Sequence, residues 1–218
     1  MSEKLNLAAI RKNYSLQGLT EELVLSDPFA QFNKWMQEAL AAQVEEPTAM
    51  VLSTVDAAGQ PSSRVVLLKA VEENKFIFFS NYNSRKGKEM ALTGKVALTF
   101  FWPALERQIR IEGQVTQVQP ALSDEYFASR PRGSQIGAWA SPQSQTIGNR
   151  QELEKATTAI QEKFGENEPI PRPPHWGGFG VSPTYIEFWQ GRPNRLHDRL
   201  AFTRPTPEKN WVLTRLAP

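Results

Sequence analysis

Five short apolar runs between residues 49 and 118 constrain the fold of this chain more than any other feature. They are rich in β-branched and aromatic residues, and turn signals such as the stretch Asp56–Gly59 separate them. The runs occupy residues 49–55, 64–71, 75–80, 95–102 and 107–118. Strands of this length at such regular spacing predict an antiparallel meander that closes into a β-barrel.

Helical patterns surround this β region. Residues 29–44 repeat apolar side chains at helical spacing, after Asp27 as a candidate N-cap and Pro28 at the first helical position. The apolar positions are Phe29, Phe32, Met36, Ala39 and Leu40. Further helices are predicted at 85–92, 122–129 and 150–164, an irregular loop at the proline-rich segment 168–174, and final strands at 179–190, 199–204 and 211–216. The fold class is therefore mainly β with peripheral helices.

Composition excludes several classes of function. The chain has no cysteine and only two histidines, which argues against disulfides, thiol catalysis and a metal site. With 25 basic and 23 acidic residues, the net charge of +2 favours neither nucleic acid nor an anionic membrane as a partner. The chain contains no GxGxxG or P-loop pattern, no apolar run long enough for a membrane span and no secretory leader. We expect a cytoplasmic protein that forms one large domain.

A basic turn follows the third run of the β region. Ser84 is a natural N-cap for the helix predicted at 85–92, yet Arg85 and Lys86 stand in the first turn, where the helix dipole disfavours cations. A bound phosphate would remove this conflict and would use the free backbone N–H groups. A solvated basic turn is the alternative.

Cations also bracket the apolar run from Arg64 to Lys69. Such a run suits a strand that is covered on both faces, and the two-residue period of a strand puts Arg64 and Lys69 on opposite faces. The two cations therefore serve different ligands or different ends of one site. Alternatively, both lie at strand ends and reach into water.

Three polar side chains gather around Pro131. Tyr126 and Arg130 stand four residues apart on a short predicted helix that ends at this proline, and Ser134 follows. A phenol, a guanidinium and a hydroxyl on one side would bind an oxyanion, while a Tyr–Arg packing pair on the helix surface is the ordinary alternative. On the strand 107–118, Gln108 could pair with a heteroaromatic edge.

The segment from Glu187 to Arg199 concentrates binding chemistry directly after a strand. It holds Trp189, Arg195, His197 and Arg199, which combine a flat ring, guanidinium groups and an imidazole that titrates near neutral pH. This mixture predicts a binding or catalytic site, although a strand and turn with solvated charges would also explain it.

Taken together, these stretches resemble the pyridoxine/pyridoxamine 5′-phosphate oxidase family, from about Ile10 to Pro218. The C-terminal signature is matched by Glu187-Phe188-Trp189-Gln190 and Arg195-Leu196-His197-Asp198-Arg199. The segments RVVLLK, NSRK, ERQIRIEG, SRPRGSQIGAW and WGGF also match, in the expected order. Arg192 and Pro193 fall in the variable gap of the signature. Outside the signature, Pro142 precedes Gln143, so the resemblance does not define the path of the loop around Pro142.

The resemblance implies a single FMN-binding split β-barrel domain at residues 26–218 that forms a homodimer, with the cofactor in a cleft between subunits. It also implies a flexible flap within residues 1–25 that closes on the ligand, which the segment from Arg11 to Tyr14 resembles. Trp189 and Arg199 are expected to reach the cofactor from the other subunit. The cofactor-binding residues implied are Arg64, Val65, Val66, Leu67, Leu68, Lys69, Phe79, Ser80, Arg85, Lys86, Gln108, Gln143, Ser144, Trp189 and Arg199.

The implied activity is oxidation of pyridoxine 5′-phosphate and pyridoxamine 5′-phosphate to pyridoxal 5′-phosphate. A hydride passes from the substrate's 4′ carbon to flavin N5, and O₂ then reoxidises the flavin and yields hydrogen peroxide. The catalytic residues implied are Arg195 and His197, and the further substrate-binding residues are Arg11, Tyr14, Lys69, Tyr126, Arg130 and Ser134. Two alternatives stay open, a related flavin oxidase acting on another ring, as in phenazine biosynthesis, and a non-catalytic flavin- or haem-binding protein.

Overall fold

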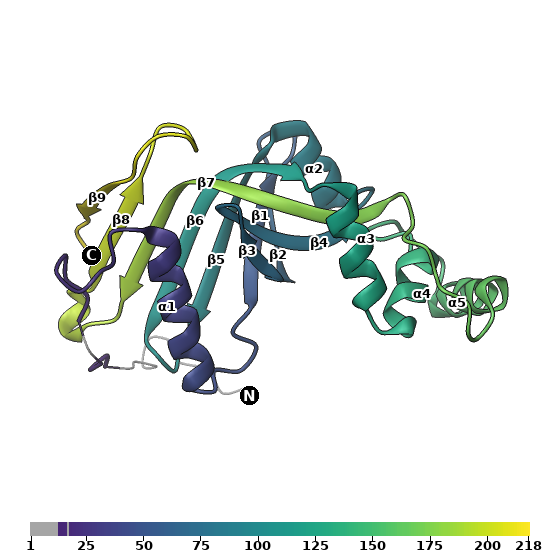
Figure 1. Ribbon diagram of the computed structural model, residues 1–218, viewed down its shortest axis with the longest axis horizontal. Helices are drawn as coiled ribbons and strands as arrows, with labels where there is room; N and C mark the ends of the chain where they lie inside the picture. The colour runs from purple at the N-terminus through teal and green to yellow at the C-terminus, as the bar shows by residue number, and fades with distance from the viewer. Residues whose placement is uncertain (1–12, 17) are drawn as a thin grey trace, which may run out of the picture. The chain divides into compact units, whose positions relative to one another are not determined.

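The computed structural model describes residues 13–16 and 18–218, and it divides into two compact units (Figure 1). The first unit comprises the N-terminal part up to Pro47 together with Thr99–Ile111 and Thr184–Pro218. The second comprises Thr48–Leu98 and Glu112–Pro183. The predicted substrate-binding residue Arg11 lies outside the described residues.

The second unit is built on a sheet whose strands run in the order β2-β1-β5-β6-β7-β4-β3. The strands are β1 (Ala49–Val55), β2 (Pro61–Leu67), β3 (Ala70–Glu72), β4 (Lys75–Asn81), β5 (Lys95–Trp102), β6 (Arg107–Gln117) and β7 (Trp176–Gln190). Strands β5, β6 and β7 also contribute residues to the first unit. Antiparallel strands with large buried side chains confirm the predicted mainly β fold.

The predicted meander is wrong in its connections. β4 pairs with β3 and β7, while β5 pairs with β1 and β6, so the strands do not follow one another across the sheet. The helix α2 (Arg85–Thr93) separates β4 from β5 and lets the chain cross back to β1. Spacing along the sequence identifies the strands, but it does not determine which of them pair.

The predicted strand 64–71 is two strands. The backbone N–H of Leu68 donates to Thr48 O at 2.9 Å, whereas that of Lys69 donates to Ile77 O at 2.8 Å. The chain therefore exchanges one partner strand for another between β2 and β3. The two-residue alternation between Arg64 and Lys69 does not apply, because Lys69 follows the end of β2.

In the first unit, α1 (Pro28–Ala41) packs an aromatic face into the core. Its N-cap is Asp27, which accepts hydrogen bonds from the backbone N–H groups of Phe29 and Ala30. Trp35 is only 3% exposed, while Leu40, predicted on the apolar face, is 58% exposed. Strands β8 (Asp198–Thr203) and β9 (Val212–Arg215) extend the sheet of this unit beyond β7.

The remaining helices belong to the second unit. α2, α3 (Pro120–Ser129) and α5 (Arg150–Phe164) agree with the predicted helices, but α4 (Arg132–Ala140) was not predicted. Its glycines, Gly133 and Gly137, have low helix propensity and hid the pattern. α4 and α5 lie side by side (Figure 1). No helix within the described ranges is long and apolar enough to span a membrane.

β7 begins three residues before the predicted start at Phe179. Its first residues include Gly177 and Gly178, which as a sequence pattern indicate a turn. A Cβ at Gly177 would collide with the Tyr82 hydroxyl, and one at Gly178 with the Val118 side chain. The two glycines therefore serve close packing within an extended strand rather than a turn.

Two glycine substitutions should separate close packing from helix propensity. A Cβ at Gly113 in β6 would meet the backbone of Ser182 at 2.3 Å, whereas Gly133 in α4 has nothing within 4 Å. We expect Gly113→Ala to lower the free energy of unfolding by about 1–3 kcal/mol. The control Gly133→Ala should raise it by about 0.5–1 kcal/mol. Urea unfolding of both variants checks this, and equal midpoints would contradict it.

Candidate active site

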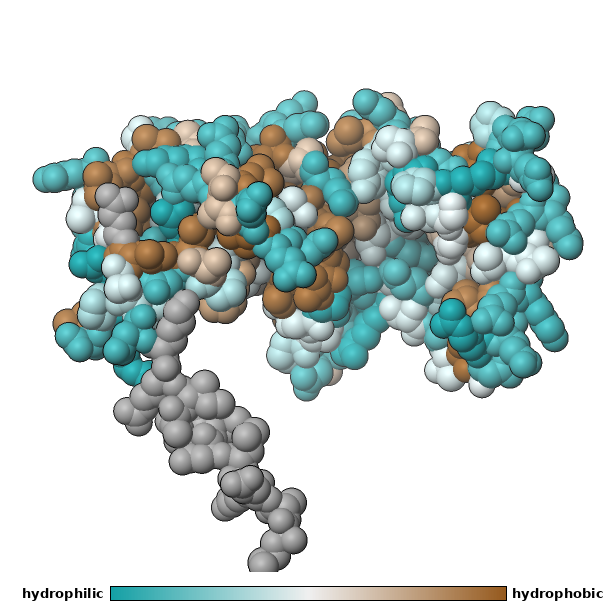
Figure 2. Space-filling model, turned by 90° about the horizontal axis from the view of Figure 1, so that it is seen from below, coloured by the Kyte–Doolittle hydropathy of each residue, from teal (hydrophilic) through white to brown (hydrophobic). Residues whose placement is uncertain are grey.

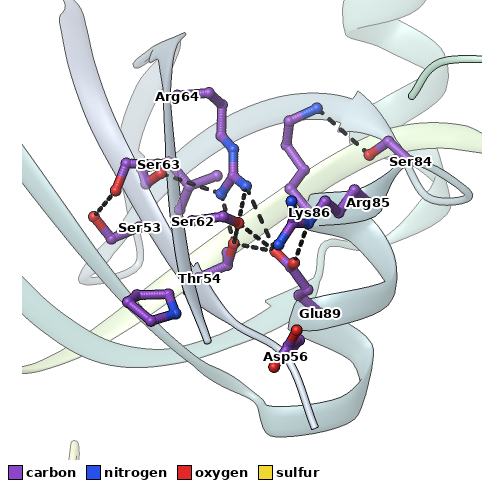
Figure 3. A network of polar contacts seen from close by, with 12 residues as sticks. Ser53, Thr54, Asp56, Ser62, Ser63, Arg64, Ser84, Arg85, Lys86 and Glu89 are labelled. Atoms are coloured by element: carbon purple, nitrogen blue, oxygen red, sulfur yellow. Dashed lines mark hydrogen bonds and ion pairs between the residues drawn. The ribbon is translucent and has the colours of Figure 1, made fainter. Parts of the chain in front are cut away.

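A buried carboxylate organises the cations at the start of α2 (Figure 3). Glu89 is 5% exposed, and its Oε1 accepts from Arg85 Nε at 2.7 Å. Its Oε2 accepts from Thr54 at 2.5 Å, from Ser62 at 2.9 Å and from Arg64 Nη2 at 3.5 Å. Arg64 Nη1 also donates to Thr54 Oγ1 at 2.5 Å. Two arginines from different elements are thus fixed by a single acidic side chain.

The predicted N-cap and three predicted cofactor-binding residues meet beside this cluster. Ser84 Oγ accepts from the backbone N–H of Gly87 at 3.2 Å, which confirms the cap of α2. Lys86 Nζ donates to Ser80 Oγ at 3.2 Å and to Gln143 Oε1 at 2.9 Å. Ser80 Oγ in turn donates to Gln143 Oε1 at 3.3 Å. Side chains more than fifty residues apart in sequence therefore lie together around one ammonium group.

Burial and hydrogen bonds shift the pKa values of the charged groups in this region. Burial by itself raises the pKa of Glu89, but hydrogen bonds from Thr54 and Arg85 outweigh it and lower that pKa to about 2. Burial lowers the pKa of Lys86, and the charge of Arg64 lowers it further. Burial also lowers the pKa of Arg64. Three cations and one carboxylate leave a formal local charge of +2, which suits a phosphate dianion.

β2 was predicted to be covered on both faces, and within the described chain it is not. Val65 is 65% exposed and Leu67 is 37% exposed, while Val66 is half-buried and Leu68 is buried. β2 stands at the end of the strand order, paired only with β1. An apolar edge strand of this kind leaves room for a ligand or for another subunit.

Aromatic rings hold a second cation in the same unit. Tyr126 stacks on Phe79 with ring centroids 3.9 Å apart, and Phe79 stacks on Trp176 at 5.6 Å. The guanidinium of Arg130 lies over the ring of Trp176, 4.5 Å from its centroid. Arg130 Nη1 is buried and has no hydrogen-bond partner among residues 13–16 and 18–218. A buried donor without a partner is costly, so this geometry favours an incoming oxyanion.

The other two members of this predicted clamp are less constrained. Lys69 is exposed and borders a pocket of about 190 Å³ together with Phe79 and Tyr126. Ser134 is exposed in the first turn of α4, and no hydrogen bond between described residues joins its hydroxyl to Tyr126 or Arg130. Arg130 itself lies beyond the end of α3 with extended backbone, because Pro131 disfavours a helical residue before it.

In the first unit, three rings gather at the end of β7. Trp189 and His197 have ring centroids 4.6 Å apart, and Tyr14 meets each of them edge-on at 5.7 Å. The backbone N–H of Arg192 donates to His197 Nδ1 at 3.1 Å. Burial lowers the pKa of His197, and the charge of Arg195 lowers it further. Because Nδ1 accepts the Arg192 N–H, the neutral ring carries its proton on Nε2.

The backbone conformation of the turn, rather than a side-chain contact, positions Arg195. It and Asn194 adopt positive φ angles of 62° and 56° in a short 3-10 turn, a conformation that L-residues adopt at a cost. Its side chain is exposed, and no ion pair or hydrogen bond of the guanidinium is found in the described part of the chain. The turn thus presents a guanidinium that is open to a ligand.

A second buried carboxylate holds Arg199. Glu187 is 1% exposed, and it accepts from Arg199 Nε at 2.7 Å and from Arg199 Nη2 at 3.0 Å. The Tyr185 hydroxyl donates to it at 2.6 Å and Arg110 Nη1 at 3.1 Å. Burial raises the pKa of Glu187, but the hydrogen bonds from Arg199 and Tyr185 reverse this and leave it below its usual range. Burial and Glu187 both raise the pKa of Tyr185.

Sequence reasoning missed the two carboxylates and one ring. Glu89 stands four residues after Arg85, a helical ion-pair spacing that was available as a signal. Glu187 was identified only as part of a motif, and Trp176 only as part of a matching segment.

Of the remaining predicted residues, Gln108 lies half-buried on β6 and Ser144 is exposed with a φ of 71°. Within the described residues no group of acidic or histidine side chains could hold a metal ion.

Comparison with known proteins identifies matches over most of the chain. Residues 36–164 match the family Pyridoxamine 5′-phosphate oxidase, and residues 176–218 match the Pyridoxine 5′-phosphate oxidase C-terminal dimerisation region. A pyridoxine/pyridoxamine 5′-phosphate oxidase from Synechocystis is 55% identical over 98% of this chain and 98% of its own. One from Burkholderia orbicola is 54% identical over 97% of this chain and 99% of its own.

Solved structures support the same fold. PhzG from Burkholderia lata, in complex with tetrahydrophenazine-1-carboxylic acid, is 28% identical with a TM-score of 0.86, over 95% of this chain and all of that one. A pyridoxamine 5′-phosphate oxidase-related, FMN binding protein from Nostoc punctiforme is 17% identical with a TM-score of 0.70, over 88% of this chain and 98% of that one. These likenesses confirm the predicted split β-barrel. With both matched regions in order along this fold, the chain belongs to the pyridoxamine 5′-phosphate oxidase family.

Proposed function

We propose that this chain is an FMN-dependent oxidase that converts pyridoxine 5′-phosphate and pyridoxamine 5′-phosphate to pyridoxal 5′-phosphate. The observation that carries the proposal is the pair of separate cationic sites, one organised by Glu89 and one containing the unpaired Nη1 of Arg130. One phosphate on the cofactor and another on the substrate account for both. The names of relatives at 52–55% identity agree.

The residues around Glu89 fit the phosphate of FMN. Arg64 and Arg85 are fixed in place, Lys86 is partly desolvated, and the formal local charge of +2 balances a dianion. We assign Ser80 and Gln143 to the same group, since both contact Lys86. The exposed apolar side chains of β2 offer a surface along which a flavin ring can pack.

The residues around Arg130 fit the phosphate of the substrate. Arg130 offers a buried donor, and Tyr126 lies against the same aromatic stack. Lys69 borders the adjoining pocket, and we include Ser134 on the resemblance alone. A substrate without a phosphate would leave Nη1 of Arg130 unpaired, so the clamp selects phosphorylated vitamers.

Bound FMN would supply the hydride acceptor for the substrate's 4′ carbon, and O₂ would take up the electrons to give hydrogen peroxide. With the amine substrate this oxidation gives an imine, which water hydrolyses to the aldehyde and ammonia. His197 is neutral, and its Nδ1 is occupied by the Arg192 N–H, so Nε2–H acts as a hydrogen-bond donor and not as the base. We propose that it orients the substrate ring. The open guanidinium of Arg195 would stabilise negative charge that develops on the substrate.

We propose that the enzyme is a homodimer in which Trp189 and Arg199 of the partner subunit complete the cofactor site. The match to a C-terminal dimerisation region supports this, and Val65 and Leu67 provide apolar surface to bury. On the face drawn in Figure 2, hydrophobic side chains lie among hydrophilic ones. Because the rings of Trp189, His197 and Tyr14 contact one another, the subunit that contributes one of them must contribute all three.

We further propose that residues 26–218 unfold as one domain. Strands β5, β6 and β7 each contribute to both compact units, which supports cooperative unfolding. A single calorimetric transition would agree, and two resolved transitions would contradict it. A cytoplasmic location stays a prediction.

Anaerobic mixing with pyridoxamine 5′-phosphate is the direct test of the function. The flavin absorbance band should bleach and should return on admission of O₂ together with hydrogen peroxide. A yellow protein that no B6 phosphate bleaches would instead be a non-catalytic flavin carrier. Bleaching by a reduced phenazine precursor alone would favour the activity class suggested by the ligand of the PhzG structure.

Arg130→Gln should discriminate between phosphorylated and unphosphorylated substrates. We expect KM for pyridoxine 5′-phosphate to rise between about tenfold and a hundredfold, the cost of a lost charge-assisted hydrogen bond, with turnover of pyridoxine unchanged. Steady-state kinetics check this. The control Arg132→Gln removes a nearby guanidinium that donates only to the backbone oxygens of 164, 165 and 168, and it should leave KM unchanged. Equal efficiency with both substrates in the native enzyme would rule out the clamp.

Glu89→Gln should destabilise the protein far more than a substitution that breaks an exposed ion pair with the same i,i+4 spacing. Removing the carboxylate leaves Arg64 and Arg85 without their counter-charge, at a cost of about 3 kcal/mol. The control Glu154→Gln breaks an i,i+4 pair whose side chains are 59% and 87% exposed, which should cost less than about 0.5 kcal/mol. Urea unfolding of the apoprotein at pH 7 measures both, and similar losses in the two variants would contradict the prediction.

We expect protonation of His197 to cause the loss of kcat/KM at low pH. Protonation of Nδ1 breaks the hydrogen bond from the Arg192 N–H that holds the ring. The pKa of His197 lies below its usual 6.5, so kcat/KM should fall only at pH values below that. The stability that this histidine contributes is complete above the unfolded pKa and is lost as pH falls through the lowered folded pKa. Profiles of the native enzyme and of His197→Asn, measured with the same substrate, check this. The prediction fails if the variant keeps the same loss of kcat/KM at low pH.

A further inference from the structure

We propose that Glu106 and Gly191 are positioning residues that hold Tyr14 against His197 and Trp189. This inference rests on the proposed function, in which His197 orients the substrate ring and Trp189 completes the cofactor site. Neither residue belongs to the implied catalytic or binding set. All five residues lie in the first unit.

Glu106 fixes the backbone that follows Tyr14. Its side chain is 4% exposed, and Oε2 accepts the backbone N–H groups of Ser15 at 2.9 Å and Leu16 at 3.1 Å. One carboxylate oxygen thus receives two successive peptide donors from a segment about ninety residues away in sequence. Hydrogen bonds to an ionised acceptor are stronger than neutral ones, so this contact fixes the backbone of Ser15 and Leu16.

The position of Glu106 is itself determined by the end of β7. Its backbone φ is 54°, in the turn that leads into β6, and its carbonyl oxygen accepts from the Gly191 N–H at 2.7 Å and from Gln190 Nε2 at 3.2 Å. The turn before β6 and the residues after Trp189 are therefore joined by direct hydrogen bonds. Tyr14 is anchored to the same place through Ser15.

Gly191 leaves the space that the Tyr14 ring occupies. A Cβ at this position would lie 2.7 Å from Tyr14 Cγ and 3.0 Å from Glu106 Cβ. Cγ is the root of the ring, so a rotation of the phenol alone would not relieve the overlap. A single methyl group at 191 must therefore move Tyr14 away from its present position.

Arg192 and Asp198 hold the residues that follow Tyr14 through hydrogen bonds to their backbone. Arg192 Nη1 donates to Leu16 O at 3.0 Å, and the backbone N–H of Leu19 donates to Asp198 Oδ2 at 3.0 Å. The backbone N–H of Arg192 is also the donor to His197 Nδ1. Displacement of the Tyr14 segment would thus reach the ring that we expect to face the substrate, while the phosphate-binding residues around Glu89 would keep all their contacts.

A double-mutant cycle between Gly191→Ala and Tyr14→Ala tests the steric part. In the native background we expect Gly191→Ala to raise KM for pyridoxine 5′-phosphate about tenfold, with kcat less affected. In the Tyr14→Ala background the same change should have no further effect on KM, because the ring that it displaces is absent. A tenfold effect that persists without the ring would overturn the role of Gly191.

Glu106→Gln tests the hydrogen-bonding part independently of turnover. Amide hydrogen exchange of Ser15 and Leu16 should become at least about tenfold faster, and the His197 ring resonances should shift as Tyr14 moves. The control Glu22→Gln changes an exposed carboxylate of the same segment and should alter neither. Unchanged exchange in Glu106→Gln would overturn the anchor. If the native enzyme oxidised no B6 phosphate, the proposed function would fail, while the exchange and resonance measurements would still decide the roles of Glu106 and Gly191.

Discussion

A buried carboxylate can hold two guanidinium groups in place and still leave a net positive charge. Glu89 does this for Arg64 and Arg85, and Glu187 does it for Arg199 and Arg110. Burying a carboxylate costs several kcal/mol unless hydrogen bonds replace its hydration, and both carboxylates receive them from arginines and hydroxyl groups. Much of the entropy cost of ordering these arginines is therefore met during folding rather than on binding.

Arg130 is held by a different device. Its guanidinium lies on the face of Trp176, and no acidic side chain among the described residues pairs with it. Stacking fixes the plane of the group without supplying a counter-charge, so one N–H stays free for a ligand. The difference between arginines paired with a carboxylate and an arginine stacked on a ring suits the two phosphates that we propose. A resident cofactor can share its cations with a permanent carboxylate, whereas a substrate that binds and leaves benefits from a donor that has no competing partner.

Local patterns in the sequence predicted the elements well and their connections poorly. Apolar periodicity located α1 and most strands, because each buries one face and the pattern is contained within the element itself. It failed at Lys69, where the chain changes partner strands, and at Gly177, where close packing imitates a turn signal. Pairing of strands depends on crossovers that leave no local trace.

For the candidate site too, the sequence predicted local features but not the long-range contacts. Residue types and motifs identified the cations, the histidine and the tryptophan, since their chemistry is unusual on a folded surface. The residues that position them were missed because their contacts are distant in sequence. Glu106 reaches Ser15 across 91 positions, and Thr54 reaches Glu89 across 35. An acidic residue is common in any chain, and only the folded structure shows which one lies beneath an arginine.

The weak net charge of the whole chain is consistent with these local sites. A charge of +2 on 218 residues cannot draw a polyanion from a distance, but a local charge of the same size around Glu89 is concentrated on partly desolvated groups. Coulombic attraction grows as the surrounding dielectric falls and is screened less by salt when the charges are buried. The phosphate sites that we propose therefore depend on where the cations lie and what fixes them, since the total number of cations is nearly balanced by acidic residues.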